Sequence, residues 1–181
     1  FIYTFPAPAA GTYVYHSHFN TPEQVPRGLY GLLVVRPRGQ GWHHYDREFP
    51  LVLGTFPGSI VTGLPDGWDD VELINGRTFR TLADLEAGRN LFQMSRGDRV
   101  LFRIWNASNE VHPMHTHGMH YAVVAADSMD LDVPLHRDTM GVNAGERYDI
   151  IAHADNPGTW LFHCHNLDHV MEGMIAANIV T

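Results

Sequence analysis

Gly158-Thr159-Trp160-Leu161-Phe162-His163-Cys164-His165 is the stretch of sequence that decides the fold of this chain. An earlier segment, Gly11-Thr12-Tyr13-Val14-Tyr15-His16-Ser17-His18, matches it position by position, in identity or in residue class. Each segment has a turn residue followed by the aromatic and aliphatic residues typical of a strand, and each ends in His-X-His. The second segment starts 147 residues after the first (158 minus 11), about the size of one small β domain. The sequence therefore predicts two copies of one domain.

Short strand-like runs separated by turns continue along the chain. The only helix that we expect lies at 82–87, and the predicted strands lie at 31–35, 49–53, 100–104, 121–125, 148–152, 159–162 and 174–180. Many short strands with frequent turns are typical of an antiparallel sandwich. We therefore predict an all-β fold.

The repeat also divides the chain into parts. Residues 1–36 are predicted to be the C-terminal part of a first domain, residues 37–46 a linker that contains proline and glycine, and residues 47–181 a nearly complete second domain. Because the first copy lacks its beginning, we expect a processed or fragmentary chain. The missing part should pair with residues 1–36, since a few strands with free edges bury too little surface to be stable alone.

Composition excludes several classes of function. The formal net charge of −8 leaves no basic surface for nucleic acid. No run approaches the roughly 18 apolar residues that span a bilayer, so we expect no membrane span. The single cysteine, Cys164, cannot form an internal disulfide and gives no information on the redox compartment.

Histidine is far more frequent than usual, with 13 residues in 181, and most of these histidines are clustered. In an extended strand, residues i and i+2 point to the same face, so each His-X-His pair can direct two imidazoles towards one region. Imidazole is a suitable ligand for copper, zinc, iron and nickel, so the pairs alone do not identify the metal. The clustered histidines are His16, His18, His112, His115, His117, His163, His165 and His169.

Cys164 identifies the metal. It lies between two histidines, so its side chain should point to the opposite face and serve a different site. Two histidines, one thiolate and a weak thioether form a blue-copper electron-transfer centre, and His112, His169 and Met174 are available to complete it. A thiolate flanked by imidazoles of another cluster offers a short covalent route for electrons.

Structural roles are the alternative for each of these residues. A lone strand histidine is more often structural than a ligand, and Met174 alone would more often be core packing. The combination of three His-X-His pairs with one flanked cysteine reverses that balance. Met114, Met119 and Met171 are interpreted as packing, with binding of extra copper(I) as the alternative. The remaining histidines are interpreted as surface or supporting residues: His43, His44, His120, His136 and His153.

Three motifs resemble copper signatures of the multicopper oxidases, a family that includes laccases, ascorbate oxidase and bacterial cuprous oxidases. They are the segment at 11–18, His-Pro-Met-His-Thr-His-Gly at 112–118, and His-Cys-His-Asn-Leu-Asp-His-Val-Met-Glu-Gly-Met at 163–174. The resemblance covers nearly the whole chain. It implies a cupredoxin-like Greek-key β-sandwich and copper in a mononuclear type 1 site and a trinuclear type 2/type 3 cluster.

The resemblance also implies a role for each matching residue. The type 1 copper would be held by His112, Cys164, His169 and Met174, and the type 2 copper by His115. The type 3 pair would be held by His16, His18, His117, His163 and His165. The family's cluster uses eight histidines and this chain supplies six, so we expect the other two in the missing part of the first domain.

The repeat and the spacing indicate which kind of oxidase is resembled. Cys164 projects onto Ser17 in the first copy, so only the second domain can hold a type 1 copper. The 93 residues between His18 and His112 leave no room for a third domain. Two-domain laccases of this kind are homotrimers with the trinuclear cluster between subunits, so we predict that His16 and His18 meet the other cluster histidines across a subunit boundary.

The implied activity is the one-electron oxidation of a small reducing substrate, such as a phenol, an aromatic amine or a metal ion, coupled to reduction of dioxygen to water. Electrons would enter at the exposed edge of His169 or His112. Asp168 is a weak candidate for proton delivery, because it can instead orient a neighbouring histidine. A copper nitrite reductase and a non-enzymatic copper-binding or electron-transfer module remain as alternatives. The resemblance also implies a secreted or periplasmic protein.

Overall fold

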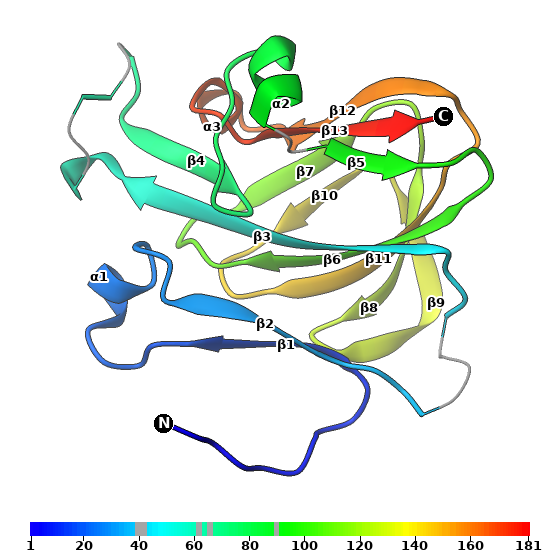
Figure 1. Cartoon of the computed structure of the whole chain (residues 1–181), viewed down its shortest axis with the longest axis horizontal. Coiled ribbons are helices and arrows are strands. Elements are labelled where there is room, and N and C mark those ends of the chain that lie inside the picture. Colours follow the sequence, from blue (N-terminus) through cyan, green and yellow to red (C-terminus); the bar gives the residue numbers. More distant parts are fainter. Residues whose placement is uncertain (39–42, 61–62, 65–66, 89–90) are drawn as a thin grey trace.

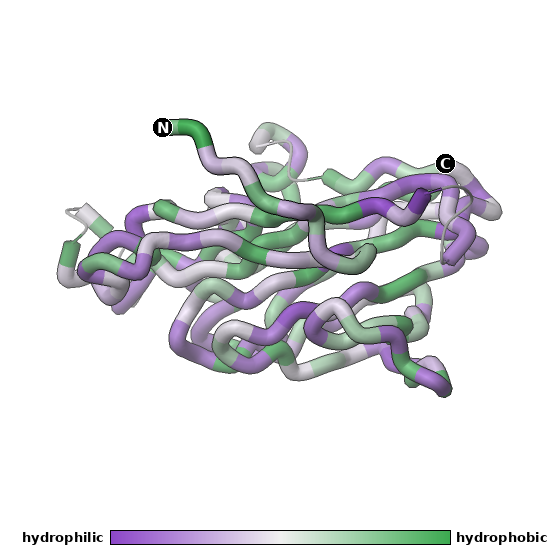
Figure 2. Tube along the Cα trace, turned by 90° about the horizontal axis from the view of Figure 1, so that it is seen from below, coloured by the Kyte–Doolittle hydropathy of each residue, from purple (hydrophilic) through white to green (hydrophobic). Residues whose placement is uncertain are grey.

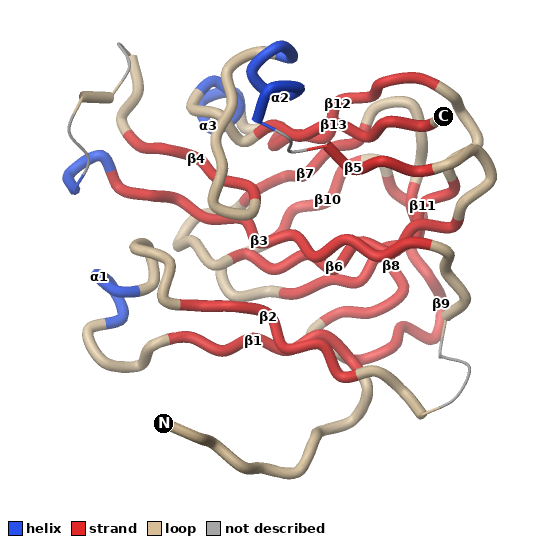
Figure 3. The backbone as a smooth tube through the Cα atoms, viewed as in Figure 1, coloured by secondary structure: helices blue, strands red, loops and turns tan. Residues whose placement is uncertain are grey.

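The computed structural model describes residues 1–181 except 39–42, 61–62, 65–66 and 89–90. Strands dominate the fold, and the few short helices lie at its periphery (Figure 3). Two larger sheets pack on each other, and a small two-stranded sheet lies beside them (Figure 1). The predicted all-β sandwich is therefore confirmed.

The larger sheet has six strands. Two of them, β3 and β6, pair in parallel, while the other neighbours are antiparallel. Neighbours in the sheet are mostly not consecutive in the chain, so the connections cross between the sheets. Its order is β4 (Asp70–Ile74), β3 (Arg47–Pro57), β6 (Arg99–Asn106), β11 (Arg147–His153), β8 (Tyr121–Ala126) and β9 (Met129–Arg137).

The second large sheet has five strands. It carries His112, His115 and His163, and His117 and His165 directly follow two of its strands. In this sheet β13 and β5 pair in parallel and the others pair antiparallel. Its order is β10 (Thr139–Val142), β7 (His112–Thr116), β12 (Gly158–Cys164), β13 (Ile175–Val180) and β5 (Leu91–Met94).

The core lies between these two sheets. Phe102 on β6 stacks on Phe162 on β12, with ring centroids 6.1 Å apart, and Phe92 on β5 meets both rings edge-on. Leu51 and Ile104 are fully buried beside them. Each fully buried leucine or phenylalanine contributes roughly 1.5–3 kcal/mol relative to an exposed one, so this interface supplies much of the stability.

The third sheet joins β1 (Gly11–His16) to β2 (Tyr30–Val35) through the short helix α1 (Thr21–Gln24). It contacts the six-stranded sheet through a buried polar cluster. Thr12 Oγ1 donates to Asp149 at 2.7 Å, and Arg103 donates to Asp149 at 2.6 Å and to Thr12 at 2.7 Å. Tyr30 packs edge-on against Trp105, with ring centroids 5.3 Å apart. These contacts fix β1 relative to β6 and β11.

The chain before β1 is apolar and projects from the body of the molecule (Figure 2). Phe1, Ile2 and Tyr3 have relative exposures of 117%, 95% and 82%. Among the described residues, no helix is long and apolar enough to cross a membrane.

The seven predicted strands and the predicted helix are all present, the helix as α2 (Leu82–Gly88), where Leu85 packs against Phe79 and Ala177. The sequence did not predict the strands β4, β5, β7, β9 and β10, the helices α1 and α3 (Leu167–Met171) or the 3-10 turn at Gly58–Ile60. The linker predicted at 37–46 includes residues 39–42, which lie outside the described part of the chain.

Candidate metal centre

The end of β12 presents neighbouring side chains to opposite faces of its sheet. Cys164 is fully buried and faces the core, whereas His163 is half-buried and His165 is exposed on the other side. β7 alternates in the same way, with His112 buried and His115 half-buried. Because His163 pairs with His115 in the register of β12 and β7, the outward histidines of both strands face the same region. The structure therefore shows these side chains in two separate groups, one on each side of the sheet.

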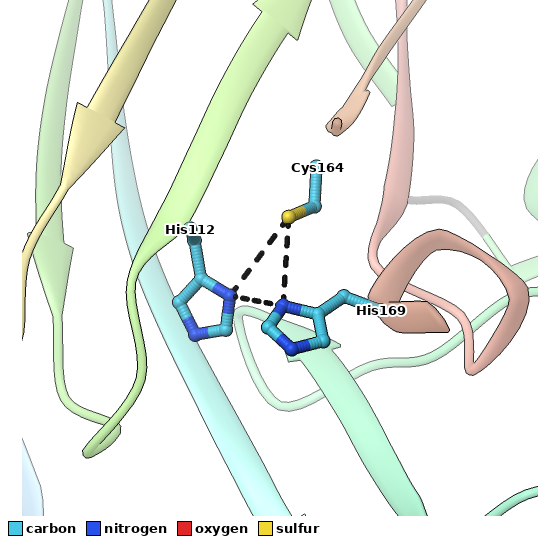
Figure 4. A group of neighbouring side chains, drawn as sticks. All are labelled: His112, Cys164 and His169. Atoms are coloured by element: carbon cyan, nitrogen blue, oxygen red, sulfur yellow. Dashed lines mark hydrogen bonds between the residues drawn. The ribbon is translucent and has the colours of Figure 1, made fainter. Parts of the chain in front are cut away.

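The inward group consists of His112, Cys164 and His169 (Figure 4). The Nδ1 atoms of the two histidines are 3.0 Å apart. The Sγ of Cys164 lies 4.0 Å from the Nδ1 of His112 and 3.6 Å from the Nδ1 of His169. His112 comes from β7, Cys164 from the end of β12, and His169 from α3. All three are nearly or fully inaccessible to solvent.

The outer nitrogens of both imidazoles have partners elsewhere. The Nε2 of His112 lies 2.7 Å from the Ser108 hydroxyl, and the Nε2 of His169 lies 2.8 Å from a Glu110 carboxylate oxygen. Asn166 Nδ2 also lies 3.0 Å from the Nε2 of His169, so this nitrogen donates to Glu110 or accepts from Asn166, depending on the tautomer. With the proton of each ring on Nε2, the Nδ1 lone pairs of both imidazoles would face the thiol and could bind a cation there.

Burial sets the protonation states of this group. It lowers the pKa of His112 to about 3, with help from His169, and so keeps the ring neutral. It raises the pKa of the Cys164 thiol to about 12. A metal ion that binds here must therefore displace the thiol proton, which couples metal binding to proton release.

Met174 follows α3 and its side chain is fully buried. Its backbone joins the other members of the group: Cys164 N–H donates to the Met174 carbonyl at 3.1 Å, and Met174 N–H donates to the His169 carbonyl at 3.0 Å. Gly173, with φ of 106°, makes the turn that brings Met174 back beside β12. The methionine is thus held next to the group by the same loop that supplies His169.

The outward group consists of His115, His117 and His163, whose ligand nitrogens lie within 4.8 Å of one another. The Nε2 atoms of His117 and His163 are 3.1 Å apart. The Nδ1 of His115 is engaged by Thr139 Oγ1 at 2.8 Å, which leaves its Nε2 available. The His165 ring lies 5.5 Å from that of His115. Four imidazoles therefore gather on this face of the sheet.

His16 and His18 lie elsewhere. Their rings are 5.9 Å apart at the end of β1, and both side chains are exposed. Within the described chain, no ring contact joins either of them to the outward group. His16 instead lines a cleft of about 360 Å³ between α1 and the six-stranded sheet, which Ser108 and Glu110 also line.

A hollow of about 290 Å³ adjoins His169. Burial raises the pKa of Glu72 in this hollow to about 8. Glu72 therefore keeps its proton at neutral pH and adds no charge. Six carboxyl groups line the hollow, which makes it acidic beside the inward group: Asp69, Asp70, Glu72, Glu110, Asp168 and Glu172.

Of the two histidines expected to admit electrons, His169 or His112, only His169 borders solvent. His112 has no exposed edge: its exposure is 0%, because Ser108 and the core cover it. His169 is 5% exposed and lines the acidic hollow, so it is the histidine of this group that an external molecule can approach.

Sequence reasoning did not identify Ser108, Glu110 or Glu72 as partners of the site. Glu110 and Ser108 precede His112 by two and four positions, which is a weak signal, whereas Glu72 is brought close only by the fold. His43, His44, His120, His136 and His153 do not contribute to either group, as expected.

Two family models, both described as multicopper oxidase, match residues 65–181 and 1–40. The first alone covers more than half of the chain, so the chain belongs to the multicopper oxidase family. Members of this family are copper oxidoreductases, and their cofactor is copper in type 1 and trinuclear sites.

Two solved structures share the fold. A blue copper oxidase from Nitrosomonas europaea has 29% identity and a TM-score of 0.82, over 97% of this chain and 57% of that one. A multicopper oxidase named mgLAC has 31% identity and a TM-score of 0.81, over 94% of this chain and 56% of that one. The fold is therefore the cupredoxin-like sandwich of this family, and this chain spans little more than half the length of these relatives.

One similar protein is named as a nitrite reductase fusion. A "Probable nitrite reductase-hydroxylamine oxidoreductase fusion protein" from Kuenenia stuttgartiensis is 29% identical over 178 residues, which cover 94% of this chain and 19% of that protein.

Proposed function

We propose that this chain is the copper-binding part of a laccase-like oxidase, which couples one-electron oxidation of a small reducing substrate to the four-electron reduction of dioxygen to water. The observation that carries the proposal is the position of Cys164. Its thiol lies in the inward group, while its chain neighbours His163 and His165 lie with the outward group.

The donor atoms of both groups fit copper. Two imidazoles, a thiol and a buried methionine form the set of a type 1 site, to which we assign His112, Cys164, His169 and Met174. Four imidazoles without a thiol suit the trinuclear cluster, to which we assign His115 (type 2) and His117, His163 and His165 (type 3). Copper, if bound there, would supply one-electron transfer at the first site and dioxygen reduction at the second.

The protein itself connects the two groups covalently and shields the inward group from water. The backbone bonds from Cys164 to His163 and His165 give a short covalent path between the two groups. Burial of His112 and Cys164 keeps water from the inward group, and Ser108 and Glu110 hold its imidazoles in one orientation.

We propose that His16 and His18 complete the outward group of a neighbouring subunit in a homotrimer. Support comes from their exposure and from their separation from the four histidines of their own chain. The same proposal treats residues 1–36 as part of a first cupredoxin domain, residues 37–46 as a linker and residues 47–181 as a second domain.

The substrate is proposed to meet the protein at the acidic hollow beside His169. Its carboxyl groups favour a cationic donor, such as a metal ion or a protonated aromatic amine, over an anionic one. A secreted or periplasmic location is proposed by analogy with the family.

Nitrite reduction is the second candidate, favoured by the printed name of the Kuenenia relative. It would require a single catalytic copper, whereas four imidazoles converge on the outward face of this chain. Copper stoichiometry per chain separates the two candidates.

The experiment is oxygen uptake by the copper-loaded full-length protein with a phenol, an aromatic amine and Cu(I) as donors. We expect oxygen consumption with at least one donor and loss of both this activity and the blue colour in Cys164→Ser. Nitrite-dependent turnover without oxygen uptake would support the reductase, and neither activity would leave an electron-transfer module.

A further inference from the structure

Three histidines outside both metal groups gather at one end of the six-stranded sheet. They are His120 before β8, His136 on β9 and His153 at the end of β11. These three strands are neighbours in the order β11-β8-β9. Residues far apart in the sequence are therefore brought to one place by strand pairing.

The strand register places the three side chains on the same face. Ala152 pairs with Tyr121, so the residues that flank this pair, His153 and His120, lie opposite each other. His136 pairs with Ala122, two residues after His120, and is therefore its diagonal neighbour. Opposite residues have Cβ atoms about 4.5–5.5 Å apart and diagonal residues are about 7–8 Å apart, so His120 is within reach of both other imidazoles. His136 and His153 lie on either side of β8, roughly 10 Å apart across the strands, so an ion between them would have to sit near His120.

This face is open to solvent. Tyr121 points into the core with 3% exposure, so the alternation of β8 directs His120 and Ala122 outwards. His120, His136 and His153 are all exposed, and together with Asp155 they line a hollow of about 550 Å³. Asp138, whose carboxylate lies 4.0 Å from the Nε2 of His120, adds a second acidic group at its edge.

We propose that His120, His136 and His153 form a binding site for a divalent transition metal ion of the zinc or copper(II) type. Three imidazoles are the ligand set that such ions favour, and a nearby carboxylate or water completes the coordination. The ligand atoms of this trio are not among the groups that already converge within 4.8 Å in the described chain. Binding therefore needs rotation about the side-chain bonds of exposed residues, which are free to turn.

The chemistry distinguishes this site from the two groups described above. It has no thiol, so a bound ion would give no intense blue colour, and its three ligands are all accessible without opening the protein. The proposal does not depend on the oxidase activity.

The test is a titration of the copper-loaded protein with Zn²⁺, followed by calorimetry and by metal analysis after gel filtration. The blue absorption is recorded throughout, to show that zinc has not replaced copper at Cys164. We expect one additional zinc per chain, with the blue band unchanged. His136→Ala should weaken this binding by at least about tenfold, since even the loss of a residue that supports a ligand costs that much.

His44→Ala provides the matched control, because His44 is an exposed histidine outside the hollow. It should bind the additional zinc as the unaltered protein does. The double variant His120→Ala/His153→Ala should lose it, with an unchanged melting temperature as the check on folding. No additional zinc in the unaltered protein, or equal affinity in His136→Ala and His44→Ala, would overturn the proposal.

Discussion

Replacing Arg103 with alanine would leave Asp149 buried without its ion-pair partner. In the folded protein Arg103 is 3% exposed and Asp149 is 2% exposed, and the two groups are 2.6 Å apart. Thr12 and Glu48 complete the network. Breaking a buried ion pair by removing one partner costs about 3–5 kcal/mol, because the remaining charge is uncompensated. For a chain of this size, we expect a fall in melting temperature of roughly 6–20 °C.

The loss of stability in Arg103→Ala should increase as the pH rises. Burial already raises the pKa of Asp149, and Arg103 counteracts that rise. Without Arg103 the pKa rises further, so the folded variant retains a proton that the unfolded chain releases. Its stability therefore falls as pH rises above the ordinary carboxyl pKa. The difference between the variant and the unaltered protein should be larger at pH 8 than at pH 5.

The assay is urea-induced unfolding at both pH values, with Arg47→Ala as the control. Arg47 pairs with Asp98, but its side chain is 44% exposed, so this change should cost only about 0–1 kcal/mol. Hydrogen exchange of β1 should also increase in Arg103→Ala, since Thr12 loses a bond to the sheet. A loss below about 1 kcal/mol at pH 8, or no dependence on pH, would refute the assumption of a buried ionic network.

Three further predictions concern the metal centre and its surroundings. Met174→Leu should raise the reduction potential of the blue copper, measured by redox titration of its absorption. Met171→Leu, at an exposed position, should leave the potential unchanged. An unchanged potential in Met174→Leu would contradict the assignment of Met174 as a weak ligand of the type 1 copper. Gly118→Ala should destabilise the protein by more than about 1 kcal/mol, because φ is 74° and a Cβ would lie 2.2 Å from the Trp160 ring. Gly97→Ala is the control, since φ is 93° there but a Cβ would meet nothing within 4 Å. Equal losses in the two variants would show that the contact with Trp160 is harmless. Removing copper with a chelator should lower the melting temperature, since an ion that binds only the folded state stabilises it. The shift should be smaller in Cys164→Ser, which lacks a ligand of the inward group; an equal shift in both proteins would contradict copper binding at Cys164.

The repeat and the alternation of strand residues predicted the facing of the side chains around Cys164 and the positions of several strands. The pattern of His163-Cys164-His165 predicted one inward and two outward side chains, and the structure shows this arrangement. The strands with aliphatic and aromatic runs, such as 100–104 and 148–152, were also located correctly. Metal binding by these residues stays a prediction.

Other elements gave no usable pattern. β9 is exposed along most of its length, so it lacks the alternation of apolar and polar residues that marks a half-buried strand. β7 is made of histidine, proline, methionine and threonine, which indicate ligands rather than a strand. The acidic hollow could not be predicted, because its carboxyl groups come from β4, from the loop before β7 and from the region of α3, and only the tertiary fold brings them together.

Because Cys164 is completely buried, the reactivity of its thiol reports local unfolding of the protein. It is the single cysteine in the sequence, and its exposure is 0%. In the copper-free protein, a maleimide or other thiol reagent can therefore label Cys164 only during moments when the core around β12 opens. The labelling rate gives the frequency of such openings at one defined position, without any engineered probe.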